Sequence, residues 1–114
     1  MTPAEYLETY HGIKPMCGCT IEAGWFPLVR ALVVALERRG FRGEQVDQIK
    51  QKFAGLRFYT SSHDDYVDRI IRVAEVASRD TCETCGMDGR QRSSKGWFYV
   101  GCDACDVTAP GTDP

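Results

Sequence analysis

The sequence predicts an α+β fold, in which a small helical and β core carries a C-terminal four-cysteine zinc ribbon packed against it. Three observations lead to this prediction: apolar residues recur at helical spacing in separate segments, residues 56–60 alternate as in a strand, and two Cys-x-x-Cys pairs lie near the C-terminus. We expect the core over residues 1–80, the ribbon over 81–106 and a flexible tail over 107–114. A chain of 114 residues is the size of one domain, and a bound metal helps to stabilise so small a core.

Proline and capping residues mark where helices should begin. Thr2 and Glu5 can form a capping box around Pro3 at the first helical position. Pro27 suits the first turn of a second helix, and Gly40 suits the left-handed residue just past its end. Aspartates crowd the first turn of a third helix, where the helix dipole favours negative charge. The predicted helices cover about residues 3–10, 27–39 and 64–79.

Two neighbouring segments differ in how clearly they indicate a strand. Residues 56–60, LRFYT, have the composition and the alternation of a β-strand. Residues 45–53 fit either a helix or a strand, because their apolar residues suit both spacings. Ala54 and Gly55 can form a turn, so we slightly prefer a hairpin partner of the following strand for this segment.

The clearest motif is a pair of Cys-x-x-Cys sequences with sixteen residues between them. Cys82 and Cys85 form the first pair, and Cys102 and Cys105 form the second. This spacing is typical of a structural zinc site, in which each pair makes a tight turn that directs both sulfurs at one point. We therefore predict one structural Zn²⁺ bound by these four cysteines.

Two smaller groups of polar residues allow more than one interpretation. Cys17 and Cys19 form a Cys-x-Cys pair with His11 nearby, and they either bind a second metal or are reduced, partly buried cysteines in a turn. The second interpretation is favoured, because the C-terminal pairs already supply four ligands. His63 and the aspartates that follow it could form a metal or acid–base cluster, but helix capping explains them more simply.

Charge and hydropathy limit the classes of function. The net charge of −2 shows no overall basic excess, although residues 38–57 are locally basic. This basic stretch is either a partner-binding face or an ordinary solvated surface. The chain has no apolar run that could cross a bilayer, and its N-terminus lacks the pattern of a signal peptide, so we expect no membrane and a reducing cytoplasm. The candidate partner-binding residues are Arg38, Arg39, Arg42, Arg57, Arg90, Arg92, Lys95 and Trp97.

Two stretches of the sequence resemble a family of small zinc-ribbon proteins from bacteriophages and prophages. The family pattern is approximately QIKEKFGGLRFY, followed by a helix and then by CExCG, a Gly-Trp pair and a final CxxC. Residues 48–59 match the first part, with Gln51 and Ala54 in place of the usual Glu and Gly, and residues 82–105 match the second. An upstream Gly-Trp pair, at 24–25, is also similar to the family's, so the resemblance covers roughly residues 24–105.

The resemblance implies a phage or prophage origin and expression in a bacterial cytoplasm. Small phage proteins of this kind often bind a host protein, sometimes one that belongs to a defence system such as CRISPR–Cas. We therefore expect a non-catalytic, zinc-stapled protein that binds or inhibits a host protein complex. The identity of the partner and the oligomeric state stay open.

Two other classes of function compete with this expectation. In a nucleic-acid-binding zinc ribbon, Arg90, Arg92 and Lys95 in the loop between the cysteine pairs would contact phosphates, and Trp97 would stack on bases. An enzyme is the least favoured class. Four thiolates leave no open position on zinc for an activated water, and no Ser–His–Asp or Cys–His arrangement is recognisable.

Overall fold

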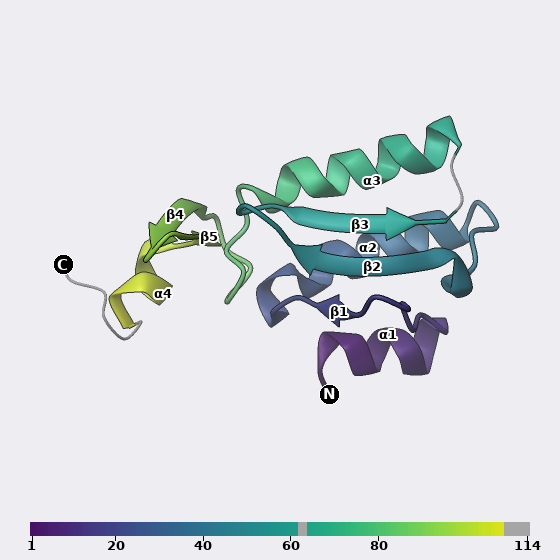
Figure 1. Ribbon diagram of the computed structural model, residues 1–114, viewed down its shortest axis with the longest axis horizontal. Coiled ribbons are helices and arrows are strands. Elements are labelled where there is room, and N and C mark those ends of the chain that lie inside the picture. The colour runs from purple at the N-terminus through teal and green to yellow at the C-terminus, as the bar shows by residue number, and fades with distance from the viewer. Residues whose placement is uncertain (62–63, 109–114) are drawn as a thin grey trace.

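A three-stranded sheet with helices on one of its faces forms the core of the computed structural model, which describes residues 1–61 and 64–108. The α+β prediction is confirmed (Figure 1). The core elements are α1 (Pro3–His11), β1 (Cys19–Thr20), α2 (Phe26–Glu37), β2 (Val46–Gln51), β3 (Leu56–Thr60) and α3 (Asp65–Ser78). The C-terminal ribbon contains β4 (Arg90–Ser94), β5 (Trp97–Gly101) and α4 (Asp103–Thr108). Short 3-10 turns, Ala23–Trp25 and Gly43–Gln45, precede α2 and β2.

The helices begin where the sequence places their caps. Thr2 and Glu5 form the capping box of α1, and Asp64 caps α3 by accepting a 2.8 Å hydrogen bond from the backbone N–H of Val67. The last segment differs from the expected tail, because α4 continues to Thr108. Residues 109–114, and His63 of the proposed acid–base cluster, lie outside the described residues.

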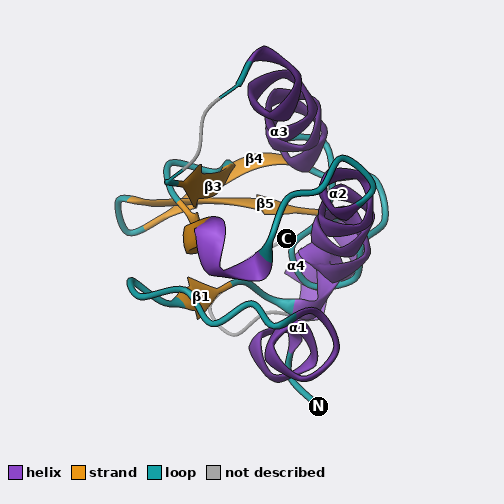
Figure 2. Cartoon of the chain, turned by 90° about the vertical axis from the view of Figure 1, so that its right-hand side faces the viewer, coloured by secondary structure: helices purple, strands orange, loops and turns teal. Residues whose placement is uncertain are grey.

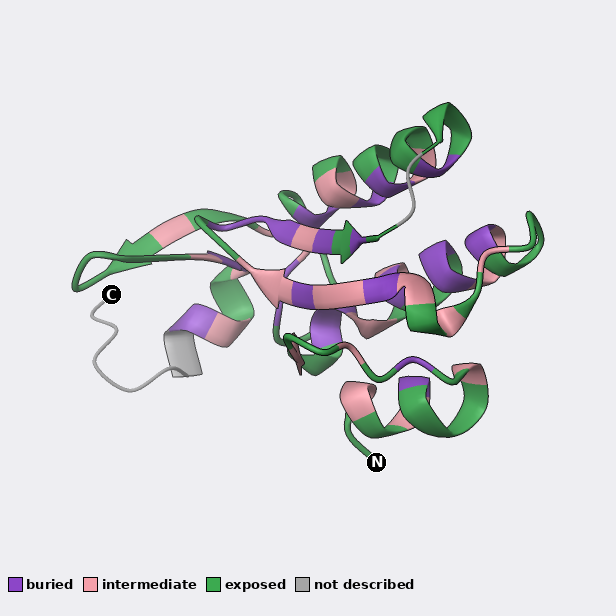
Figure 3. Ribbon diagram, turned by 45° about the vertical axis from the view of Figure 1, so that its right-hand side comes forward, coloured by how far each residue is buried: buried purple, intermediate pink, exposed green. Residues whose placement is uncertain are grey.

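The sheet has the order β1-β2-β3, with β1 parallel and β3 antiparallel to β2. The ambiguous segment before the turn is therefore the hairpin strand β2. Figure 2 shows α1, α2 and α3 on the same side of this sheet. The buried residues of the sheet and of the three helices form one hydrophobic cluster between these two layers, and Figure 3 colours the buried residues purple.

The other face of the sheet is open and carries polar and aromatic side chains. On this face Gln48 lies opposite Tyr59, and Lys50 lies opposite Arg57. The alternation of β3 produces this division, because Leu56, Phe58 and Thr60 are buried while the residues between them are not. No helix in residues 1–61 and 64–108 is both long and apolar enough to cross a membrane.

The β2–β3 hairpin closes through a tight turn that holds two non-glycine residues at positive φ. Phe53 has a φ of 53° and Ala54 a φ of 60°, while Lys52 and Gly55 exchange backbone hydrogen bonds of 2.8 and 3.2 Å. This pattern fits a two-residue type I′ turn, in which Asn-Gly is strongly preferred. The Phe53 side chain is 69% exposed, so little burial offsets a backbone cost of about 1 kcal/mol.

Replacing Phe53 by asparagine should therefore stabilise the protein. We expect Phe53→Asn to raise the free energy of unfolding by about 1 kcal/mol, because asparagine tolerates positive φ better than phenylalanine. Urea denaturation measures the change. Phe53→Ala is the matched control: it removes the same ring but keeps an unfavourable backbone, so it should change stability little. Equal stabilisation by both substitutions would refute the backbone explanation.

Candidate metal centre

Two turns bring four cysteine sulfurs together at the far end of the molecule. Cys82 and Cys85 lie in the turn after α3, and Cys102 and Cys105 lie at the start of α4. All four sulfurs are within 4.8 Å of one another, and the Cys85 and Cys102 sulfurs are 3.5 Å apart. In a tetrahedron with metal–sulfur bonds of about 2.3 Å, the sulfurs lie about 3.8 Å apart. The cluster therefore has the dimensions of a tetrahedral metal site.

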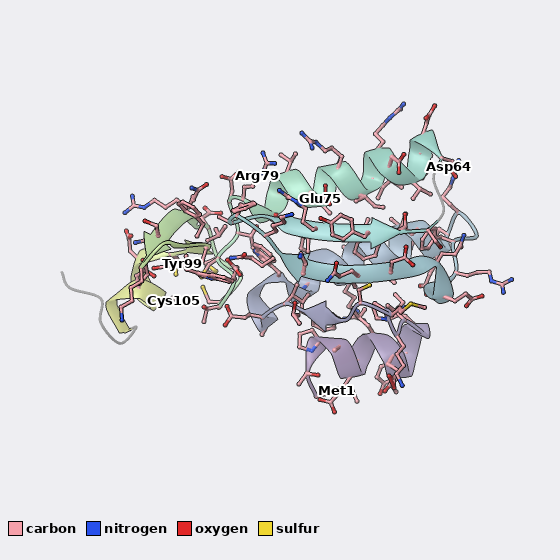
Figure 4. All side chains as sticks on the ribbon, viewed as in Figure 1. Met1, Asp64, Glu75, Arg79, Tyr99 and Cys105 are labelled. Carbon is pink, nitrogen blue, oxygen red and sulfur yellow. The ribbon has the colours of Figure 1, made fainter. Side chains whose placement is uncertain are left out.

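Backbone hydrogen bonds shape both turns. In the first, the Cys82 carbonyl accepts a 2.9 Å hydrogen bond from Gly86, whose φ of 83° suits a glycine. In the second, the N–H of Cys105 donates to the Cys102 sulfur at 3.4 Å. Figure 4 shows Cys105 and Tyr99 in the ribbon, at the end of the molecule away from Asp64. The local sequence of each pair thus directs its sulfurs inwards.

The pKa values of the clustered thiols explain why this site suits a cation. Burial opposes ionisation of Cys82, but the backbone N–H groups of Cys85, Thr84 and Cys102 outweigh burial and lower its pKa to about 6. The neighbouring Cys102 and Cys85 sulfurs, with burial, raise the pKa of Cys105 to about 12. Four sulfurs this close cannot all carry a negative charge unless a cation compensates for it. A divalent metal ion would supply that compensation, so the donor set fits a metal.

The first cysteine turn packs directly on the start of α2. The backbone N–H of Gly24 donates a 2.7 Å hydrogen bond to the Glu83 carbonyl. The indole N–H of Trp25, a fully buried side chain, donates to the Thr81 carbonyl at 2.8 Å. A β-carbon on Gly24 would lie 2.2 Å from the carbonyl oxygen of Cys82. Only glycine allows this approach of the two backbones.

A buried carboxylate joins the core sheet to the ribbon. Glu83 accepts hydrogen bonds through Oε2 from the Val100 N–H at 2.7 Å and from the Gln51 amide at 3.3 Å. The Gln51 amide also donates to the Phe98 carbonyl at 2.6 Å. Burial raises the pKa of Glu83 despite these donors. The contacts of Gly24, Gln51 and Glu83 were not predicted from the sequence. The only sequence features that could have indicated them are the Gly-Trp pair and the Glu that follows Cys82.

The candidate partner-binding residues do not form one surface. Arg38, Arg39 and Arg42 follow α2 at the end of the sheet away from the ribbon (Figure 1). The Arg39 guanidinium lies 3.7 Å from the centre of the Tyr66 ring, and Arg42 pairs with Glu44. Arg57 lies on the open face of the sheet, and Arg90, Arg92, Lys95 and Trp97 lie in the β4–β5 hairpin.

Residues 90–95 were expected to form a loop, and this expectation is wrong. Residues 90–94 form the strand β4, which is joined to β5 by a turn at Lys95 and Gly96, both at positive φ. Arg92 donates to Asp103 and pairs with Asp106, with N–O distances of 2.5 Å, and Arg90 lies 3.5 Å from the Asp103 carboxylate. The arginine charges of β4 are therefore neutralised within the ribbon.

The N-terminal cysteines are not brought to a third ligand. Within the part of the chain that the structure describes, the four C-terminal cysteines are the only group of three or more residues that could hold a metal. His11 instead contacts the Glu37 carboxylate through Nδ1, at 3.0 Å. Cys17 is exposed, and Cys19 is partly buried in β1, where burial raises the pKa of its thiol.

The Gly24 contact makes a specific prediction about stability. Gly24→Ala should lower the free energy of unfolding by about 3 kcal/mol, because its β-carbon would collide with backbone atoms of Cys82 and Glu83. In the control variant Gly55→Ala, the tightest contact would be with the end of the flexible Arg57 side chain at 3.0 Å, so the loss should stay below about 1 kcal/mol. Urea denaturation compares the two, and equal losses would contradict a close approach at Gly24.

Comparisons with protein-family models, with curated proteins and with solved structures found no match, so they assign the chain to no family.

Proposed function

We propose that the protein is a non-catalytic binding protein whose ribbon is held together by one structural Zn²⁺. The observation that carries this proposal is the closed set of four cysteine sulfurs within 4.8 Å of one another. Zinc is the metal whose structural sites are most often tetrahedral sets of thiolates. Catalytic zinc keeps a position for water or substrate, and four thiolates fill every position of a tetrahedral ion. The role that fits this donor set is to hold the two cysteine turns together.

The metal part of the proposal is tested by metal analysis of the purified protein. We expect one zinc ion per chain, and we expect Cys102→Ser to lose the zinc and more than about 3 kcal/mol of stability, because zinc-binding energy in small modules is largely folding energy. Cys17→Ser is the matched control, since Cys17 is exposed and lies outside the cluster, and it should keep both. Absence of zinc, or unchanged stability in Cys102→Ser, would refute the structural ion.

For the partner, we propose a protein complex of a bacterial host, in the cytoplasm, bound by a protein of phage or prophage origin. The resemblance of the two sequence motifs to phage proteins supports this origin, and a host defence complex such as CRISPR–Cas is one such partner. The end of α2 supplies suitable contact residues, because Arg38 and Arg39 are exposed and Arg39 stacks on the half-exposed Tyr66. Arginine and tyrosine are enriched among the residues that dominate protein interfaces.

Affinity capture from a bacterial lysate, with and without nuclease, tests the partner. We expect a defined protein complex that survives nuclease treatment and that falls at least about tenfold with Arg38→Glu/Arg39→Glu, since reversing two hot-spot charges costs more than 1.4 kcal/mol. Lys14→Glu reverses an exposed charge near the N-terminus, and it should leave the capture unchanged. Recovery of nuclease-sensitive material alone would refute a protein partner.

A further inference from the structure

A pocket of about 270 Å³ lies where the β2–β3 hairpin meets the β4–β5 hairpin. The hydrogen bond from the Gln51 amide to the Phe98 carbonyl holds the two hairpins together at its base. The pocket contains none of the metal-binding cysteines and lies at the opposite end of the sheet from Arg38 and Arg39. Its lining includes the side chains of Lys50, Lys52, Phe53, Trp97 and Phe98.

Large aromatic rings line this pocket and remain in contact with solvent. Trp97 is 66% exposed and Phe98 is 40% exposed, from adjacent positions at the start of β5. Phe53 lies across from them at the tip of the other hairpin, on a left-handed backbone that asparagine or glycine would adopt at lower cost. A ring kept exposed at an unfavourable backbone position indicates a role other than stability.

Positive charges lie beside the rings, and no carboxylate of residues 1–61 and 64–108 forms an ion pair with them. Lys50 and Arg57 are direct cross-strand partners on the open face of the sheet, a pairing of like charges that destabilises a hairpin. Among the described residues, Lys50, Lys52 and Arg57 form no ion pair within the chain. The basic excess is local, because the whole chain has a net charge of −2. An anion bound here would remove the repulsion between Lys50 and Arg57.

We infer that this pocket binds single-stranded nucleic acid, with a base against the rings of Phe53 and Trp97 and neighbouring phosphates on Lys50, Lys52 and Arg57. Stacking suits unpaired bases, because each exposes a flat π-face to which an aromatic side chain can bind. Lysine commonly binds phosphate, which it contacts as a point charge. Two of the three cations are lysines, and lysine is depleted at protein interfaces, so the chemistry favours a nucleic acid over an acidic protein.

This inference goes beyond the proposed protein partner, since it assigns a different ligand to a different end of the molecule. It also relocates the nucleic-acid contacts expected from the sequence. Arg90 and Arg92 are paired with Asp103 and Asp106, whereas the cations beside the pocket have no carboxylate partner in the part of the chain that the structure describes. Trp97 is the residue common to both hypotheses.

Fluorescence anisotropy of zinc-loaded protein with labelled twelve-nucleotide oligo(dT) and oligo(U) tests the inference. We expect binding at 50 mM salt that weakens at 200 mM, because phosphate contacts release counterions. Phe53→Ala and Trp97→Ala should each weaken binding roughly tenfold, the effect of losing one stacked base. Lys50→Gln/Lys52→Gln should reduce the slope of log affinity against log salt by about 1.4, which corresponds to two phosphate contacts on a single strand.

Matched variants separate loss of the site from loss of the fold. Phe53→Asn removes the ring while relieving the backbone, so weaker binding by this more stable variant cannot come from unfolding. Arg90→Gln and Lys14→Gln remove exposed charges away from the rings and should bind like the unmodified protein. Zinc content and urea denaturation are measured for each variant, so failure of the metal site is detected independently of the pocket.

Three outcomes would overturn the inference. The first is no binding to either oligonucleotide at 50 mM salt. If Trp97→Ala also abolishes capture of a nuclease-resistant protein partner, the pocket is instead a protein-binding site. The second is binding that neither aromatic substitution weakens. The third is a duplex of the same length that binds as tightly as the single strand, because paired bases cannot stack on these rings. Preference for oligo(dT) or oligo(U) would support the inference and distinguish DNA from RNA.

Discussion

The backbone contact between Gly24 and the turn at Cys82–Glu83 determines how the two parts of this protein fit together. The Gly24 N–H donates a 2.7 Å hydrogen bond to the Glu83 carbonyl, and a β-carbon on Gly24 would lie 2.2 Å from the carbonyl oxygen of Cys82. The buried Trp25 side chain and the Glu83 carboxylate extend the same junction to either side. The cysteine turns are therefore built on the core, so metal binding and core packing support one another.

The sequence predicts well those features that depend on residues close together in the chain. The Thr2–Glu5 capping box and the two Cys-x-x-Cys turns are local, and both occur in the structure. The strand β2 was ambiguous because its register shifts between Val46 and Gln48, which interrupts the alternation that would distinguish it from a helix. Contacts such as that of Trp25 with Thr81, 56 positions apart, depend on the folded arrangement and leave no local pattern.

Charge pairing divides the basic residues of this chain into those that are neutralised within the fold and those that are not. Arg92 and Asp106 are separated in the sequence, but the fold of the ribbon brings them together as an ion pair in which each neutralises the other. Lys50 and Arg57 both belong to the locally basic residues 38–57, and the antiparallel register sets them side by side with no ion pair to a carboxylate among the described residues. A basic residue therefore has to be judged by its neighbours in the fold, since the same type of side chain is neutralised by a carboxylate in one place and left without an ion pair in another.

The two tryptophans of the chain occupy opposite environments, which gives the molecule two built-in optical reporters. Trp25 is fully buried against the first cysteine turn, while Trp97 is largely in solvent beside Phe53. Emission from Trp25 is expected to respond to docking of the ribbon on the core, and emission from Trp97 to a molecule bound in the pocket. With one tryptophan replaced at a time, intrinsic fluorescence can follow assembly of the ribbon in one variant and occupancy of the pocket in the other, without a label.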